Sequence, residues 1–315
     1  MSEQKHAVGQ SANSIRNAAE KLQKSFKSGD MKPLIEILST TTHTELLAIS
    51  AHFARTYDDT LKNVVLKKTS GDFKDVCLAL IMGPYMYKAK YLNEAMKGIG
   101  ANEQEMVDVI CQSTPNEIKH ITAAYGVQFG EGSTDNEKIV RDVKSETGFN
   151  LKKVFLNILE GRKPNSSNFG DLETVAEELY KKGEGRMGTN NKYFVEIFST
   201  KSRDYLSLLA KEYAVKNPGH TLEGAVKTEL SGNYRTAMLA LITDKIAYFA
   251  ERARQSIAGL GTNERGLVYS IVSLTKQERI AVSKYYAANF SETLQKAISG
   301  DTSGDLELIL LSLIS

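Results

Sequence analysis

Four short stretches decide the fold of this chain: Lys68-Thr-Ser-Gly-Asp-Phe73, Glu146-Thr-Gly-Phe-Asn-Leu151, Glu229-Leu-Ser-Gly-Asn-Tyr234 and Asp301-Thr-Ser-Gly-Asp-Leu306. Their first residues are 78, 83 and 72 residues apart, and the last residue of each begins an apolar pattern at offsets 0, 3, 4, 7 and 8. That spacing places one apolar stripe along a helix of 3.6 residues per turn. The residue before each stripe is of a type that caps a helix N-terminus: Asp72, Asn150, Asn233 or Asp305. Four matched copies predict a fourfold helical repeat.

A glycine-rich turn recurs about forty residues before the acid in three of the copies. The turns read Met96-Lys-Gly-Ile-Gly-Ala-Asn-Glu103, Gly183-Glu-Gly-Arg-Met-Gly-Thr-Asn190 and Ile257-Ala-Gly-Leu-Gly-Thr-Asn-Glu264. Each turn separates two helical stretches, a third helix follows as in 115–129 and 203–215, and a fourth leads into the acid. The pattern therefore predicts an all-α protein with about five helices in each repeat. The first copy departs, because its turn is Lys27-Ser-Gly-Asp-Met31.

The repeats set the expected domain boundaries. We expect a flexible tail over 1–11, repeat 1 over 12–83, repeat 2 over 84–160, a linker over 161–169, repeat 3 over 170–243 and repeat 4 over 244–315. The segment Gly161-Arg-Lys-Pro-Asn-Ser-Ser-Asn-Phe-Gly170 is polar and contains Pro and Gly. It predicts a division of the chain into two halves of two repeats.

Composition excludes several classes of protein. The 315 residues include 40 basic and 38 acidic side chains, and a net charge of +2 is too balanced for a protein that coats nucleic acid. There is no apolar run long enough for a transmembrane helix and no apolar core of a secretory signal. Cys77 and Cys111 are too few for a disulfide framework and are expected in the core. The missing signal and the two cysteines indicate an intracellular protein. The five histidines have no metal-ligand or nucleophile spacing, so we do not expect an enzyme.

The glycine turns have the chemistry of an oxygen cage. Glycine allows backbone carbonyls to turn toward one point, and the carbonyls at a helix C-terminus are already unsatisfied. One distant carboxylate would complete the hard oxygen shell that Ca²⁺ prefers. The alternative is that each turn only ends one helix and starts the next, with Thr189 and Thr262 as N-caps. The recurrence of a turn with an acid 46, 41 and 40 residues after Gly100, Gly188 and Gly261 favours the cage.

Four repeats with these turns and a distant carboxylate resemble the annexin family over residues 12–315. The resemblance implies a slightly curved disc whose convex face binds Ca²⁺ and uses it to bridge to anionic phospholipid. Carried over position by position, it implies three sites. The ligands would be the carbonyls of Met96, Gly98 and Gly100 with Glu146, of Gly183, Arg186 and Gly188 with Glu229, and of Ile257, Gly259 and Gly261 with Asp301.

The chain departs from the family pattern at several positions. Lys68 stands at the acid position of repeat 1, where the glycine turn is also missing, so no site is expected there. In repeat 2, Ala101 replaces the usual Thr and Gly148 lies one place early. The family's Arg near the end of the second helix is replaced in the four repeats by Thr41, Ser113, Lys201 and Leu274. This divergence resembles that of the giardins, protist relatives whose likeness would add a cytoskeletal association.

The tips of the three turns are apolar: Ile99, Met187 and Leu260. They either enter the acyl boundary of a membrane or pack back on the helix below. Lys97 and Arg186 either pair with lipid phosphates or are ordinary solvated cations. Glu103 and Glu264 follow the turns, where an acid either interacts with the helix dipole, which we favour, or holds a second ion.

Two functions fit this pattern. The first is Ca²⁺-dependent binding to anionic phospholipid at the cytoplasmic face of the plasma membrane. The second is a helical-repeat scaffold for cytoskeletal proteins that does not need Ca²⁺. An anionic polysaccharide is an alternative anionic partner, and nucleic acid is not expected.

Overall fold

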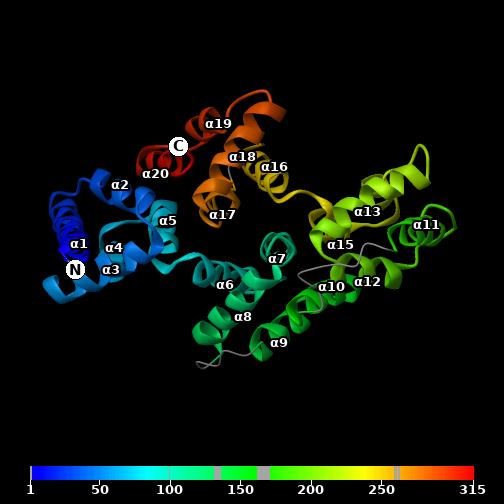
Figure 1. Ribbon diagram of the computed structural model, residues 1–315, viewed down its shortest axis with the longest axis horizontal. Helices are drawn as coiled ribbons and strands as arrows, with labels where there is room; N and C mark the ends of the chain where they lie inside the picture. The colour runs from blue at the N-terminus through cyan, green and yellow to red at the C-terminus, as the bar shows by residue number, and fades with distance from the viewer. Residues whose placement is uncertain (1, 99, 131–135, 162–170, 259–260, 262) are drawn as a thin grey trace. The chain divides into compact units, whose positions relative to one another are not determined.

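The structure is a computed structural model, and it describes residues 2–98, 100–130, 136–161, 171–258, 261 and 263–315, with side chains from Ala12 onward. Twenty helices and no strand are present in these ranges (Figure 1). Five helices fall in each repeat, which confirms the all-α fourfold architecture.

The helices of the first and last repeats belong to one compact unit, residues 1–87 and 249–315. Repeat 1 contains α1 (Ser2–Ser28), α2 (Lys32–Thr40), α3 (His43–Tyr57), α4 (Leu61–Lys68) and α5 (Gly71–Met82). Repeat 4 contains α16 (Lys245–Ile257), α17 (Glu264–Val272), α18 (Lys276–Asn289), α19 (Leu294–Asp301) and α20 (Gly304–Leu313). Within this unit α2 packs on α20 and α5 packs on α17.

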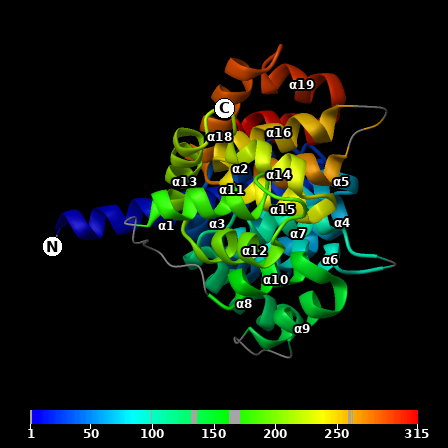
Figure 2. The ribbon, with the colours of Figure 1, turned by 90° about the vertical axis from the view of Figure 1, so that its right-hand side faces the viewer.

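The second unit, residues 88–248, is formed by the two middle repeats. Repeat 2 contains α6 (Pro84–Ala95), α7 (Glu103–Ile110), α8 (Pro115–Phe129), α9 (Glu137–Glu146) and α10 (Phe149–Leu159). Repeat 3 contains α11 (Leu172–Lys182), α12 (Asn191–Thr200), α13 (Arg203–Lys216), α14 (Leu222–Glu229) and α15 (Gly232–Ile242). Here α10 packs on α12 and α15 packs on α7, and both ribbon views show these pairs together (Figures 1 and 2).

One expectation about chain organisation needs correction. The units join repeat 1 to repeat 4 and repeat 2 to repeat 3, so the chain does not divide into sequential halves at the linker. The physical reason is that the last helix of one repeat packs on the second helix of another, and helix periodicity carries no information about that pairing. Helix α1 begins at Ser2, and the flexible tail expected over residues 1–11 stays a prediction.

Polar caps explain where the third helix of each repeat begins. Thr42 with Glu45, Thr114 with Glu117 and Thr275 with Glu278 form capping boxes at α3, α8 and α18, and Ser202 caps α13 alone. The four predicted caps of the fifth helices are wrong: Asp72, Asn150, Asn233 and Asp305 lie inside the first turns. The N-cap positions belong to Ser70, Gly148, Ser231 and Ser303, none of which makes a side-chain cap bond.

The apolar stripes form the core as predicted. In α10 all five stripe positions are buried, and the other three fifth helices bury most of theirs. Cys77 and Cys111 are both buried thiols, as expected, and burial raises the pKa of Cys77 far above its ordinary value. Among the described residues no helix is long and apolar enough to cross a membrane.

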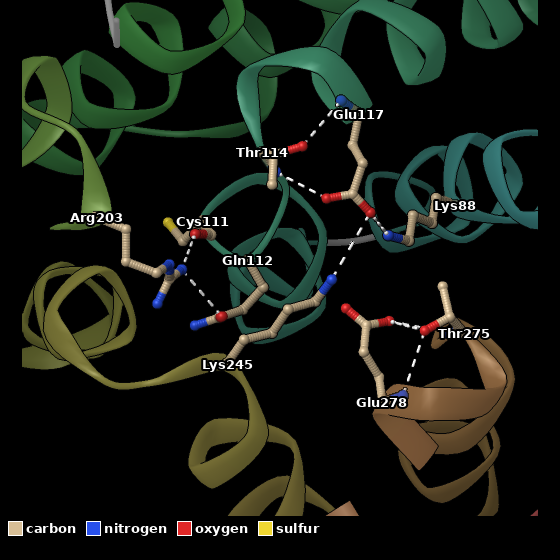
Figure 3. Close-up of polar contacts among 9 residues, drawn as sticks. All are labelled: Lys88, Cys111, Gln112, Thr114, Glu117, Arg203, Lys245, Thr275 and Glu278. Carbon is tan, nitrogen blue, oxygen red and sulfur yellow. Dashed lines mark hydrogen bonds and ion pairs between the residues drawn. The ribbon is translucent and has the colours of Figure 1, made fainter. Parts of the chain in front are cut away.

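A half-buried arginine that the sequence pattern does not reveal ties repeat 2 to repeat 3. Arg203 donates to the carbonyl of Cys111 and to Oε1 of Gln112, both at 3.0 Å (Figure 3). It also donates to the carbonyl of Thr243. Gln112 in turn donates to the carbonyl of Ala240 at 2.6 Å. The resemblance places the family's arginine at Lys201, two residues before Arg203. Sequence spacing therefore did not predict the contacts of Arg203.

Candidate functional site

Three loops between the first and second helices of repeats 2, 3 and 4 share one hydrogen-bond frame. In each, the backbone N–H of an asparagine donates back to the preceding helix: Asn102 to Ala95, Asn190 to Lys182 and Asn263 to Ser256, at 2.7–2.8 Å. The same asparagines cap the next helices with their side chains. Asn190 therefore takes the N-cap role that the alternative interpretation gave to Thr189, and Thr262 lies outside the described residues. Asparagine at this position was the signal that sequence reasoning overlooked.

The position of the acid is also common to the repeats. Lys68, Glu146, Glu229 and Asp301 are each the last residue of a fourth helix. Three residues later the backbone is left-handed in every repeat, with φ of +58° at Gly71 and Gly232, +64° at Gly304 and +48° at Phe149. This match supports the alignment of Glu146 with the other acids. It also reveals that repeat 2 places a phenylalanine where the others have glycine, at a cost of roughly 1–2 kcal/mol.

In repeat 3 the loop and its distant acid touch. The hydroxyl of Thr189 donates to Oε2 of Glu229 at 2.5 Å, although forty residues separate them. Gly188 has a φ of +79°, and its loop turns at this point. The carbonyl of Gly183 accepts one bond from the N–H of Arg186 at 3.1 Å. Among the described residues no backbone N–H donates to the carbonyls of Arg186 or Gly188, so these two oxygens are available to a cation.

In repeat 4 the loop and the acid share a depression. Ile257, at the end of α16, and Asp301, at the end of α19, both line a hollow of about 420 Å³ that Glu292 and Lys296 also border. Gly261 has a φ of +93°. The predicted ligand Gly259 and the predicted apolar tip Leu260 lie outside the described residues.

In repeat 2 the described contacts do not join the loop to the acid. Gly98 and Gly100 are left-handed, with φ of +97° and +86°, and Met96 is buried at the start of the loop. Glu146 accepts a hydrogen bond from the neighbouring Ser145 at 3.2 Å. The tip residue Ile99 lies outside the described residues.

The loop of repeat 1 is much shorter than the others. Only residues 29–31 separate α1 from α2, against seven residues between α6 and α7. Lys68 is exposed at the acid position. The described first repeat therefore has a short loop and a lysine where the other repeats have a longer loop and an acid.

The side chains around the loops have distinct surroundings. Met187 is 98% exposed, so it does not pack back on its helix. Lys97 lies 5.8 Å from the ring centre of Phe129, and Arg186 is exposed. Glu103 accepts a hydrogen bond from Asn233 at 2.7 Å, which gives it a structural role.

The positions equivalent to Asn233 and Glu103 in the first unit are both acidic. Asp72 is the second residue of α5 as Asn233 is of α15, and Glu264 begins α17 as Glu103 begins α7. Burial and the nearby carboxylates of Glu264 and Asp75 raise the pKa of Asp72 above its ordinary range. In the second unit the amide of Asn233 donates to Glu103. At the equivalent positions of the first unit, the carboxylates of Asp72 and Glu264 repel each other.

The donor set suits Ca²⁺ better than a transition metal. Nowhere in the described ranges do three His, Cys, Asp or Glu side chains come together. Backbone carbonyls of the loops and the carboxylates expected to join them are hard oxygen ligands.

The repeats and their loops match a known family. Four segments, residues 17–80, 87–158, 174–241 and 248–313, match the family described as Annexin. The chain belongs to the annexin family. Human annexin A13 is 32% identical to this annexin over 304 residues, with 94% of each chain covered. The structure of annexin III superposes with a TM-score of 0.87 at 29% identity, covering 95% of this chain and 93% of the other.

The giardins are more distant from this annexin. The calcium-bound structure of alpha-14 giardin gives a TM-score of 0.81 at 19% identity, covering 95% and 99% of the two chains, which shows the shared fold alone. The cytoskeletal association that a giardin-like chain would have stays a prediction. Annexins in general are non-enzymatic proteins that bind anionic phospholipid membranes in a calcium-dependent manner.

Proposed function

We propose that this annexin binds anionic phospholipid membranes through Ca²⁺ held in the loops of repeats 2, 3 and 4. The carbonyls of Met96, Gly98 and Gly100 with Glu146, of Gly183, Arg186 and Gly188 with Glu229, and of Ile257, Gly259 and Gly261 with Asp301 would hold the ions. The apolar residues Ile99, Met187 and Leu260 and the cation of Lys97 would contact lipid; among them Met187 is fully exposed. We infer that it acts at the cytoplasmic face of the plasma membrane.

The observation that carries the proposal is the 2.5 Å bond between Thr189 and Glu229. It holds the single carboxylate of repeat 3 against a loop in which, among the described residues, two carbonyls have no backbone donor. A loop that served only to connect two helices would not need a carboxylate from another helix at this point. The bond also keeps the carboxylate beside the loop when no ion is bound.

Charge explains why lipid and ion should act together. One carboxylate per loop leaves a Ca²⁺ ion with an incomplete oxygen shell and a net positive charge. When bound, the ion supplies an electrostatic bridge to a lipid phosphate. The residues of the chain orient the carbonyls, hold the carboxylate through Thr189 and present Met187 to the boundary between headgroups and acyl chains.

Co-sedimentation with vesicles tests the proposal. The protein should pellet with phosphatidylserine vesicles in Ca²⁺, remain in the supernatant when a chelator is added, and ignore phosphatidylcholine vesicles in both conditions. Equal binding with Ca²⁺ and with chelator would contradict it. That result would favour the alternative, a helical scaffold for cytoskeletal proteins.

A further inference from the structure

Phe149 is an exposed aromatic residue in a backbone conformation that suits glycine. The residue is 94% exposed, and its φ is +48°. The equivalent positions of the other repeats are Gly71, Gly232 and Gly304, all left-handed. Since an exposed ring adds no buried area to the core, folding gains nothing from phenylalanine here that glycine would not provide.

The packing of α10 places Phe149 at the same end of the second unit as the loop of repeat 3. Helices α15 and α7 are the equivalent of α10 and α12. They begin side by side, where Asn233 donates to Glu103, and they are still in contact where Gln112 donates to the carbonyl of Ala240. In the α10–α12 pair, Asn157 bonds Ser199 at 2.8 Å, and each lies eight residues after the start of its helix. The two contacts show that α15 and α7 run parallel. Since Asn157 and Ala240 have the same offset in their helices, equivalence between the repeats places the start of α10 beside the start of α12.

This arrangement brings Phe149 into line with two features of the proposed membrane site. Glu146, the expected ligand of repeat 2, is three residues before it in the same turn. Met187, which is 98% exposed, lies four residues before α12. The two most exposed large apolar side chains of the described residues thus share one end of the second unit.

The charges near Phe149 identify the surface that it fits. Lys144, Lys153 and Lys192 are exposed at the end of α9 and in the first turns of α10 and α12. An aromatic ring flanked by cations suits the interface of an anionic bilayer, where the ring enters the acyl boundary and the ammonium groups meet phosphates.

We propose that Phe149 is a membrane-inserting residue in the turn between α9 and α10, which anchors the second unit in anionic bilayers together with Met187. This inference rests on the proposed function and extends it from the glycine loops to the turn that follows the expected ligand Glu146. The left-handed backbone directs an aromatic side chain away from the protein at the position where the other repeats have none.

A single-tryptophan reporter tests the inference, because the chain has no tryptophan of its own. Phe149→Trp should show a blue-shifted emission on vesicles of equal parts phosphatidylserine and phosphatidylcholine with Ca²⁺, and quenching when the acyl chains are brominated. Chelator should reverse both changes. As a matched control we choose Asn116→Trp, which is exposed in the first turn of α8 and follows the end of α7, away from the loops. Its emission should stay unshifted while the protein pellets.

A second variant measures the contribution of the ring to binding. Phe149→Gly installs the residue of the other repeats, so its thermal midpoint in chelator should not fall, while its affinity for the same vesicles should fall about tenfold. An unshifted emission from pelleted Phe149→Trp, or undiminished binding by Phe149→Gly, would overturn this inference and leave the proposed function standing. If the parent protein also fails to pellet in Ca²⁺, both are overturned.

Discussion

At the scale of single residues, the carboxylate of Glu117 has a strongly lowered pKa in the second unit. Its Oε1 lies 2.7 Å from the Lys88 ammonium and 3.7 Å from that of Lys245, and its Oε2 accepts the N–H of Thr114 (Figure 3). Burial raises the pKa of Glu117, but the two ammonium groups and the hydrogen bonds outweigh it and lower the pKa to about 2.

The depressed pKa of Glu117 makes a prediction about stability and pH. A carboxylate whose folded pKa lies below its ordinary 4.5 stabilises the fold above that value, and the contribution is lost as pH falls from about 4.5 to 2. Glu117→Gln should therefore lower the free energy of unfolding by about 3 kcal/mol at pH 7, and the difference should shrink below about pH 4.5. Urea unfolding at several pH values measures this.

A surface acid provides the control for Glu117. Glu177 pairs with Lys181 at 3.4 Å, and both side chains are largely exposed. Glu177→Gln should change stability by less than about 0.5 kcal/mol. A loss in Glu117→Gln that does not depend on pH would show that ionisation of this carboxylate is not its cause.

A second prediction at this scale separates ion binding from folding. Glu229→Gln with Asp301→Asn removes the formal charge from two loops but keeps the shape of each side chain, and the amide oxygen introduced by Glu229→Gln can still accept from the hydroxyl of Thr189. The double variant should lose most Ca²⁺-dependent vesicle binding and melt, in chelator, within a few degrees of the parent. Glu223→Gln is the control, because it removes one negative charge at the start of α14, away from the loop. It should bind vesicles in Ca²⁺ as the parent does. Retained binding by the double variant, or failure to fold, would show that these acids are not chiefly Ca²⁺ ligands.

At the scale of helices and loops, periodicity predicted the fold well. The third helix expected at 115–129 is α8 with the same bounds, and the stripe that begins at Leu151 is buried throughout. Caps were harder to predict, because Asp, Asn, Ser and Thr all accept N–H bonds and often stand next to each other. In the loop of repeat 3, Asn190 caps the helix and Thr189 is left to bind Glu229, an assignment that depends on the folded loop.

The short loop of repeat 1 makes a prediction about sites. Lys68→Glu would restore an acid at the end of α4, but residues 29–31 are too few to offer the carbonyls that the longer loops provide. The number of Ca²⁺ ions bound in the presence of phosphatidylserine vesicles, measured by equilibrium dialysis, should stay that of the parent. In the reciprocal variant, Glu229→Lys, it should fall by one. An added ion in Lys68→Glu would show that the acid alone makes a site.

At the scale of the whole molecule, the chain returns at its end to the unit in which it begins. Helix periodicity predicts which face of a helix is buried but not which helix covers it. For this reason the polar linker predicted a boundary between two halves, whereas the observed units are 88–248 and the two terminal segments together. The sequence also did not predict the left-handed backbone of Phe149. The neighbouring Gly148 suggested that the turn lies one residue earlier.

The last prediction follows from this division. A fragment of residues 84–248 contains a complete unit and should be helical and unfold cooperatively. A fragment of residues 1–83 should remain largely unfolded, because α2 and α5 pack on α20 and α17, which it lacks. The longer fragment has Glu146 and Glu229 but not Asp301, so it should bind phosphatidylserine vesicles in Ca²⁺ more weakly than the full chain, as expected when one of several linked contacts is lost. Circular dichroism measures the helicity and unfolding of the two fragments, and co-sedimentation measures the vesicle binding of the longer one. A folded 1–83 fragment or an unfolded 84–248 fragment would show that stability is not divided between the two units in this way.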